Sequence, residues 1–318
     1  MNAPSALVLT GPTGSGKSEW AWRLAQRLPI EIISVDSAQV YRGMDIGTAK
    51  PSAEVRSRIA HHLLDIRDPA ERYSAGEFVR DARTVVRAIL ERGRLPVLVG
   101  GTMLYLRALL SGMAELPQAC PAVRAELEAR AAALGWPALH EELARLDPRA
   151  AARIHAHDAQ RIQRALEVHQ LTGRTISDWQ AATSEPRDRV HWLRFALVPQ
   201  DRAALRRSLA ARFASMLDAG LLAEVTSLFR RPDLHVELPA IRSVGYRQLW
   251  AYCAGRIGLE EASSLAVTAT CQLAKRQMTW LRAESGYECL DPTDDSGFAR
   301  ILEVTESSGF MAAQARGC

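Results

Sequence analysis

The stretch Gly11-Pro-Thr-Gly-Ser-Gly-Lys-Ser18 constrains the fold of this chain more than any other part of the sequence. It fits the phosphate-binding pattern G-x-x-x-x-G-K-[ST] at every fixed position. The apolar run 6–10 precedes it, and Ala21, Leu24 and Leu28 follow it at helical spacing. Because an apolar strand, a glycine-rich loop and a helix come in this order, the sequence predicts a phosphate-binding loop on a parallel α/β sheet.

The loop residues have the chemistry that phosphate binding needs. The glycines allow backbone N–H groups to point inward, Lys17 adds a compact positive charge, and the dipole of the following helix favours an anion. The Ser18 hydroxyl is suited to Mg²⁺, so we expect Mg²⁺ as the cofactor and Ser18 as its protein ligand. The predicted diphosphate- or nucleotide-binding residues are Gly11, Pro12, Thr13, Gly14, Ser15, Gly16, Lys17 and Ser18.

Further strands are predicted in the first third of the chain. Residues 30–36 are an apolar run with Asp36 at its carboxyl end, where open α/β sheets place their ligands. A capping box at Ser74–Glu77 begins a helix, and the buried strand 95–99 follows that helix. We predict an α/β fold: a P-loop NTPase-like parallel sheet flanked by helices. If sequential strands pair, strand 30–36 lies beside strand 6–10.

The character of the sequence changes at about residue 116. Residues 117–180 are almost entirely helix-forming, whereas 190–198 has the apolar pattern of a strand that returns to the sheet. We therefore predict an all-helical insertion domain. The expected division is a first part of the catalytic core at 1–115, the insertion at 116–190 and a second part of the core at 191–318.

The second part of the core is expected to be mostly helical. Long helices are predicted over 202–231 and 259–282. The end from Thr293 onward is rich in Asp, Ser, Gly and Ala, and we expect it to be poorly ordered.

Composition argues against a membrane protein and a disulfide-stabilised one. Of 318 residues, 47% are hydrophobic, but no run approaches the roughly 18 apolar residues of a membrane span, and the start lacks the features of a signal peptide. The five cysteines form no C-x-x-C pair, so neither a disulfide framework nor a zinc site is indicated. We expect a cytoplasmic protein. The net charge of +4 permits an anionic partner without requiring one.

Asp36 is the nearest acid to the predicted phosphate loop that stands at the end of a strand. A hydrolytic ATPase has a second strand that ends in an Mg²⁺-positioning aspartate, but strand 95–99 runs into Gly100 and Gly101. This weakens the interpretation as a motor or switch ATPase. Asp36 is instead a candidate base beside the phosphates; the alternative is an aspartate that caps a helix or orients a metal.

Arg212 is a candidate second cation. Leu205, Leu209, Arg212 and Met216 follow helical spacing, so a charge interrupts an apolar stripe. A buried arginine needs an anion. The alternative is an arginine that extends from the edge of the stripe to water or pairs with a structural carboxylate.

Three basic stretches suggest contact with nucleic acid. Residues 160–164 place two arginines on one face of a helix whose opposite face is apolar. Residues 242–247 combine charge with the ring of Tyr246, which suits phosphate contact and base stacking. Residues 275–280 add a third stretch. Since most charged runs are simply solvated faces, none of these is decisive alone.

Several motifs in a fixed order complete the pattern. They are Gly11–Ser18, Val35–Gln39, Tyr41–Pro51, His61–Pro69, Gly100–Tyr105, Arg242–Gln248 and Ala274–Trp280. Together they resemble the bacterial tRNA dimethylallyltransferases, also called tRNA isopentenyltransferases. The resemblance runs from the first strand to about Arg282, nearly the whole chain.

The resemblance implies transfer of a dimethylallyl group from dimethylallyl diphosphate to the exocyclic N6 amine of the adenosine 3′ of the tRNA anticodon, with release of diphosphate. In that family Asp36 matches the general base, Thr13 the residue that assists at the diphosphate, and Arg212 the cation on the leaving group. The reacting adenine has to swing out of its stack to reach Asp36. The residues implied in tRNA binding are Asp36, Ser37, Ala38, Gln39, Thr102, Arg124, Gln160, Arg161, Ile162, Gln163, Arg164, Arg242, Ser243, Val244, Gly245, Tyr246 and Arg247.

The expected partners are dimethylallyl diphosphate and the tRNA anticodon stem-loop, which the helical insertion would grip. We expect a monomer without a membrane partner. One alternative is a P-loop small-molecule kinase in which Asp36 accepts a hydroxyl proton. Others are an RNA-binding protein that uses a nucleotide as a switch, and isopentenyl transfer to free adenine nucleotides. The basic insertion disfavours the last, because a free nucleotide has no stem to grip.

Overall fold

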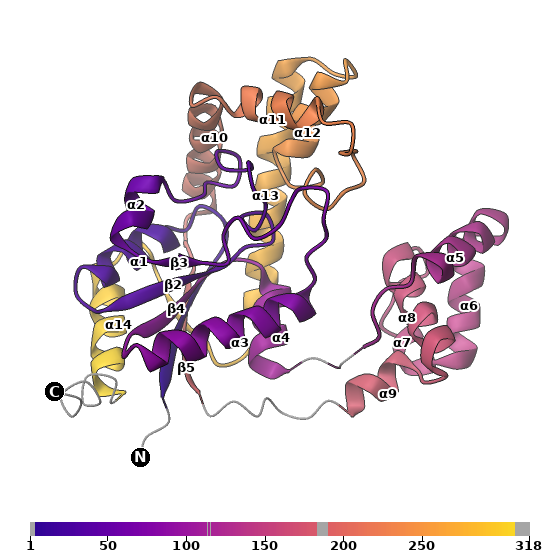
Figure 1. The fold of residues 1–318 in the computed structure, drawn as a ribbon, viewed down its shortest axis with the longest axis horizontal. Helices are drawn as coiled ribbons and strands as arrows, with labels where there is room; N and C mark the ends of the chain where they lie inside the picture. The colour runs from indigo at the N-terminus through magenta and orange to yellow at the C-terminus, as the bar shows by residue number, and fades with distance from the viewer. Residues whose placement is uncertain (1–3, 113, 115, 183–189, 309–318) are drawn as a thin grey trace. The chain divides into compact units, whose positions relative to one another are not determined.

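A computed structural model of the chain describes residues 4–112, 114, 116–182 and 190–308 (Figure 1). The chain divides into two compact units. The first comprises Met1–Arg107 and Asp188–Cys318, and the second comprises Ala108–Arg187. We had expected the insertion at 116–190.

The first unit is built on a six-stranded sheet with the strand order β3-β2-β4-β1-β5-β6. The strands are β1 Ser5–Thr10, β2 Ile30–Val35, β3 His61–His62, β4 Leu95–Gly100, β5 His191–Leu197 and β6 Glu288–Leu290. All pairings between them are parallel. The predicted α/β class, a parallel sheet flanked by helices, is thereby confirmed.

The prediction that β2 would neighbour β1 was wrong. β4 lies between them, and Val97 is paired with Leu7 on one side and with Ile32 on the other. The connection through the first helix skips one position in the sheet, and β4 fills that position later. The carboxyl ends of β1 and β2, which carry the phosphate loop and Asp36, therefore flank the end of β4.

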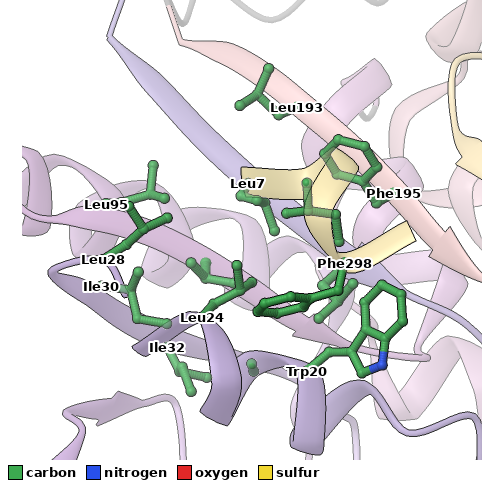
Figure 2. Packing of buried hydrophobic residues seen from close by; sticks show 14 of the residues in the cluster. Leu7, Trp20, Leu24, Leu28, Ile30, Ile32, Leu95, Leu193, Phe195 and Phe298 are labelled. Carbon is green, nitrogen blue, oxygen red and sulfur yellow. The ribbon is translucent and has the colours of Figure 1, made fainter. Parts of the chain in front are cut away.

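Both faces of the sheet are covered, as the continuous apolar runs of its strands require. Every residue of β1 and β2 is buried. Figure 2 shows one core, where side chains of the sheet meet the first and last helices. This cluster includes Leu7, Trp20, Leu24, Ile32, Leu95, Phe195, Phe298 and Ile301.

The first unit contains most of the helices, and the start of one of them was predicted from the sequence. They are α1 Lys17–Ala25, α2 Ala53–Arg58, α3 Ala75–Glu91, α4 Met103–Ser111, which extends into the second unit, α10 Arg202–Asp218, α11 Leu221–Phe229, α12 Tyr246–Cys253, α13 Leu259–Ala283 and α14 Asp295–Ser307. The predicted capping box of α3 is confirmed: Ser74 Oγ accepts from Glu77 N at 3.2 Å, and Glu77 Oε2 accepts from Ser74 N at 2.9 Å.

Two expectations about the second half of this unit were wrong. The single helix predicted over 202–231 is broken at Gly220, whose φ of 102° only glycine adopts without strain. The segment after Thr293 is not poorly ordered up to residue 308, because Phe298 and Ile301 of α14 are buried and the Phe298 ring packs edge-on against Trp20. Their spacing of three residues is helical, but the polar composition around them concealed it. Residues 309–318 lie outside the described part of the chain.

The second unit contains α5 Pro121–Leu134, α6 Trp136–Leu146, α7 Pro148–Ala151, α8 Ala159–Thr172 and α9 Ile176–Ala181. The described residues of this unit contain no strand. Its own core includes Leu127, Leu139, Leu143 and Leu166, so this unit has an apolar centre separate from the sheet. No helix in the described part of the chain is long and apolar enough to cross a membrane.

Candidate active site

The phosphate loop joins β1 to α1, as predicted. Gly11 has a φ of 149°, and a Cβ there would lie 2.4 Å from the Leu197 carbonyl oxygen, so no other residue fits. Gly16 also has a positive φ, 84°, immediately before the first turn of α1. These conformations turn the chain sharply between the end of the strand and the N-terminus of the helix, which is the arrangement that attracts an anion.

The Lys17 ammonium lies inside this loop. Its Nζ donates hydrogen bonds to the carbonyl oxygens of Gly11 at 3.0 Å and Pro12 at 2.6 Å. Burial, together with the charge of Arg212, lowers the pKa of Lys17 to about 7, although the charge of Asp36 opposes the shift. Since two cations interact across this space, an anion between them would be stabilised.

Asp36 follows β2 and turns the chain back on itself. Its Oδ1 accepts from Ala38 N at 2.8 Å and from Gln39 N at 3.3 Å. Burial raises the pKa of the Asp36 carboxyl above its ordinary value, although these hydrogen bonds and the charges of Lys17 and Arg212 oppose the rise. One oxygen thus holds the turn, and no donor among the described residues is bonded to Oδ2. Asp36 therefore stabilises its turn through Oδ1, and Oδ2 remains available to a substrate.

Thr102, from the segment after β4, is hydrogen-bonded to the same turn. Its Oγ1 accepts from Ser37 N at 3.1 Å, and its backbone N–H donates to the Val35 carbonyl at 3.1 Å. Gln39 continues the network outward, because its Nε2 donates to the carbonyls of Thr48 and Ala49. Thr102 is therefore a neighbour of the Asp36 turn in space, although it lies 65 positions from Ser37 in the chain.

Gln277 of α13 is a site residue that we did not predict. Its Oε1 accepts from Thr13 N at 2.8 Å, and its Nε2 donates to the Gly101 carbonyl at 2.9 Å. It thereby joins the phosphate loop to the segment after β4. The only hint in the sequence is its place in the motif Ala274–Trp280, since one glutamine on a long amphipathic helix ordinarily faces water.

A cavity of about 510 Å³ lies in the first unit between the phosphate loop, the Asp36 turn and the helices α10 and α13. Thr13, Asp36 and Arg212, the expected catalytic residues, all line it. The predicted tRNA-binding residues on its wall are Asp36, Ser37, Ala38, Thr102, Arg242, Ser243, Val244, Gly245 and Tyr246. Gln39 and Arg247 are not on this wall. The structure thus brings together most of the predicted site residues of the first unit.

One expectation about side-chain exposure was wrong. The Tyr246 ring is only 1% exposed and its hydroxyl donates to Glu224, so it is not a free platform for base stacking. The apolar face predicted for helix α8 is confirmed, because Ile162 is fully buried in the core of the second unit.

The other predicted tRNA-binding residues lie in the second unit, where Glu167 binds two of them, Arg124 and Arg164. The Glu167 side chain is fully buried and accepts from Arg124 Nε at 2.9 Å and from Arg164 Nη1 at 2.7 Å. Burial alone would favour the neutral acid, but these hydrogen bonds and one from Cys120 N hold the pKa of Glu167 below its ordinary value. Arg161 is exposed on the same helix and lies 3.4 Å from Asp158.

The chain is similar to proteins of one known family. The family model described as IPP transferase matches residues 39–284. The tRNA dimethylallyltransferase of Thioalkalivibrio sulfidiphilus is 56% identical over 289 residues, which cover 91% of this chain and 90% of that protein. The tRNA dimethylallyltransferase of Bordetella avium is 53% identical over 305 residues, covering 96% of this chain and 98% of that protein.

Solved structures are similar over the same length. A full-length tRNA isopentenylpyrophosphate transferase from Bacillus halodurans is 34% identical with a TM-score of 0.71, and the match covers 99% of each chain. A eukaryotic dimethylallyltransferase acting on tRNA has a TM-score of 0.81 at 25% identity, over 98% of this chain and 80% of that one. The resemblance found in the motifs is confirmed, and this transferase belongs to the IPP transferase family.

Proposed function

We propose that the protein transfers a dimethylallyl group from dimethylallyl diphosphate to the N6 amine of the adenosine 3′ of the tRNA anticodon. The observation that carries this proposal is the Asp36 carboxyl, which faces the same cavity as Thr13 and Arg212 and keeps one oxygen free of hydrogen bonds within the described chain. A base beside a diphosphate site is what such a transfer needs.

The phosphate loop would hold the diphosphate. The Lys17 ammonium donates hydrogen bonds to the carbonyls of Gly11 and Pro12. When the diphosphate binds, the same N–H groups can donate to its phosphate oxygens. Arg212, on the facing helix α10, supplies the second cation. Both charges, together with Thr13, would stabilise the negative charge that grows as the diphosphate leaves, and this stabilisation lowers the barrier.

Asp36 would accept the proton of the attacking amine. The lone pair of an adenine amine is delocalised into the ring, so removal of a proton makes the nitrogen a better nucleophile. In the transfer step the N6 nitrogen forms a bond to the allylic carbon and the carbon–oxygen bond to the diphosphate breaks. The N6 proton passes to Asp36. The diphosphate leaves with the bonding electron pair.

The residues present fit a Mg²⁺ ion held mainly by the substrate. The described residues contain no cluster of three or more His, Cys, Asp or Glu side chains that could hold a metal, and Ser18 is exposed in the first turn of α1. Mg²⁺ typically binds through substrate phosphates and few protein oxygens. Ser18 would hold it, and when bound it would neutralise charge on the diphosphate.

The tRNA would approach the wall formed by Ser37, Thr102 and the segment 242–245. The reacting base has to leave its stack to enter the cavity. Arg124, Arg161 and Arg164 of the second unit would bind backbone phosphates of the anticodon stem. We expect the enzyme to act as a monomer in the cytoplasm.

The test is incubation of the purified protein with dimethylallyl diphosphate, Mg²⁺ and unmodified tRNA, followed by mass spectrometry of the nucleosides. The expected products are N6-dimethylallyl adenosine at that one position and diphosphate. Parallel reactions contain AMP in place of tRNA, or ATP in place of dimethylallyl diphosphate. Prenylation of AMP alone would indicate the free-nucleotide enzyme, and formation of ADP would indicate a kinase.

A further inference from the structure

The carboxylate of Glu224, in the first turn of α11, binds three successive backbone N–H groups of one loop. Oε2 accepts from Asp45 N and Ile46 N at 2.8 Å each, and Oε1 accepts from Gly47 N at 3.2 Å. Oε1 also accepts the hydroxyl of Tyr246. One carboxylate thus connects the loop 45–47 to the first residue of α12.

Successive N–H groups that converge on one point form a concave site for an anion. In many proteins a phosphate of the substrate occupies such a site. Here the protein supplies its own anion, so the loop 45–47 is not available to the diphosphate. The carboxylate instead fixes the conformation of the loop.

This loop is part of the cavity wall. Gly47, Thr48 and Tyr246 all line the cavity that contains Asp36. A Cβ on Gly47 would lie 2.6 Å from Cε2 of Tyr246, so the loop backbone is pressed directly against the ring. Since Glu224 binds both partners, it determines how closely they approach each other.

The two residues that follow this loop contact the turn that contains Asp36, the proposed general base. The carbonyls of Thr48 and Ala49 accept from Gln39 Nε2 at 3.1 and 3.3 Å. The backbone N–H of Gln39 in turn donates to Asp36 Oδ1. A continuous series of contacts therefore runs from Glu224 through the loop to the turn that orients Asp36.

We infer that Glu224 is a positioning residue that shapes the part of the cavity that receives the tRNA adenine. The inference rests on the proposed function. Glu224 is not among the residues that line the cavity or contact the phosphate loop, so it acts through Gly47, Thr48 and Tyr246. Loss of its carboxylate should therefore impair use of the tRNA and leave binding of the diphosphate unchanged.

The experiment compares Glu224→Gln, Tyr246→Phe and a control, Glu31→Gln. The first change keeps the shape of the side chain but turns an amide N–H₂ toward N–H donors, and the second removes one hydrogen bond and keeps the ring. Glu31 is a buried carboxylate, bonded to Arg92 and His62 near the amino end of β2, opposite to the end that carries Asp36. It reports the effect of losing a buried ionic network away from the cavity.

We expect Glu224→Gln to raise the KM for tRNA and to lower kcat, so that kcat/KM for tRNA falls about 10-fold. Small displacements of positioning groups are costly in this way. The KM for dimethylallyl diphosphate should stay within about twofold of the wild-type value, since the phosphate loop keeps its interactions with this substrate. Tyr246→Phe should change the same constants in the same direction by less. Glu31→Gln should lower the melting temperature and leave both KM values unchanged.

Hydrogen exchange provides a second readout that does not depend on activity. Amides of residues 41–51 should exchange faster in Glu224→Gln than in the wild type, and those of residues 5–20 should be unaffected. Wild-type tRNA kinetics in both Glu224→Gln and Tyr246→Phe would overturn the inference, as would an equal rise in the KM for the diphosphate. If the wild type does not prenylate tRNA, the proposed function fails, whereas the exchange result still reports on the role of Glu224 in the loop.

Discussion

Gln277 and Thr13 are 264 positions apart in the chain, yet the Gln277 side-chain oxygen accepts the Thr13 backbone N–H at 2.8 Å. The other end of the same amide donates to the Gly101 carbonyl. One side chain of α13 therefore sets the position of the phosphate loop relative to the end of β4, and both ends of its amide are needed for this.

Replacement of Gln277 should weaken binding of the diphosphate substrate. In Gln277→Ala, the Thr13 N–H loses its partner and the loop loses its link to Gly101, so the KM for dimethylallyl diphosphate should rise about 10-fold, the effect of roughly 1.4 kcal/mol. Steady-state kinetics with saturating tRNA measure it. Gln272→Ala, an exposed change on the same helix, is the control, and equal kinetics in the two variants would contradict the assignment.

Asp36→Asn should lower kcat by about 100-fold or more, because the variant lacks a general base. The KM for dimethylallyl diphosphate should stay near the wild-type value. A large loss of affinity for the diphosphate would instead mean that Asp36 orients the metal ion.

The pH dependence of the reaction provides a separate test of Asp36. The base must be ionised, and burial raises the pKa of its carboxyl. Activity should therefore fall on acidification at a pH above the ordinary pKa of an aspartate, and this acid limb should be absent in Asp36→Asn. A pH–rate profile of kcat/KM at fixed Mg²⁺ measures the effect.

Binding of dimethylallyl diphosphate should take up a proton above neutral pH. The pKa of Lys17 is lowered to about 7 in the free protein, so Lys17 is mainly neutral at pH 8. A bound diphosphate favours the ammonium form, so binding at pH 8 should take up about one proton more than in Lys17→Arg, which is always charged. Calorimetry in buffers of different ionisation enthalpy counts the protons. Equal uptake by the two proteins would contradict the low pKa.

Glu167→Gln should destabilise the second unit and weaken tRNA binding together. Removal of the charge leaves Arg124 and Arg164 without their buried partner, at a cost on the order of 3 kcal/mol at neutral pH. Because the folded-state pKa of Glu167 is lowered, its contribution is present above the unfolded-state pKa and lost as the pH falls through the folded-state value.

Urea unfolding of wild type and Glu167→Gln at several pH values tests this pair of statements. The difference between the two proteins should shrink with acidification. Glu141→Gln, an exposed change on α6, should have no effect at any pH. A difference that is constant from pH 7 to strongly acidic conditions would show that the charge of Glu167 is not the cause.

Phe298→Ala should lower the free energy of unfolding by about 3 kcal/mol, because it removes a large ring from a closed core. The ring packs against Trp20 and lies under the guanidinium of Arg23, both on α1. Glu306→Ala, on the exposed side of α14, is the control. Thermal or urea unfolding compares them, and equal stability would mean that α14 is not part of the core.

Local patterns were sufficient to predict several elements. The strand, glycine loop and helix at the start of the chain, the capping box at Ser74 and the strand at 191–197 each depend on residues close in sequence. The family is also visible in the order of the motifs, and the comparisons confirm it. Each of these elements has its pattern within one segment, and the motifs are recognised by their order along the chain, so no knowledge of distant contacts is needed.

Only the tertiary structure decided which segments meet. The sequence contains no pattern that inserts β4 between β1 and β2, that buries Phe298 against Trp20, or that brings Glu224 to the N–H of Asp45, 179 positions away. The physical reason is that a single carboxylate, amide or ring acquires its role from its burial and its hydrogen-bond partners, and these arise only when the sheet and its helices pack together.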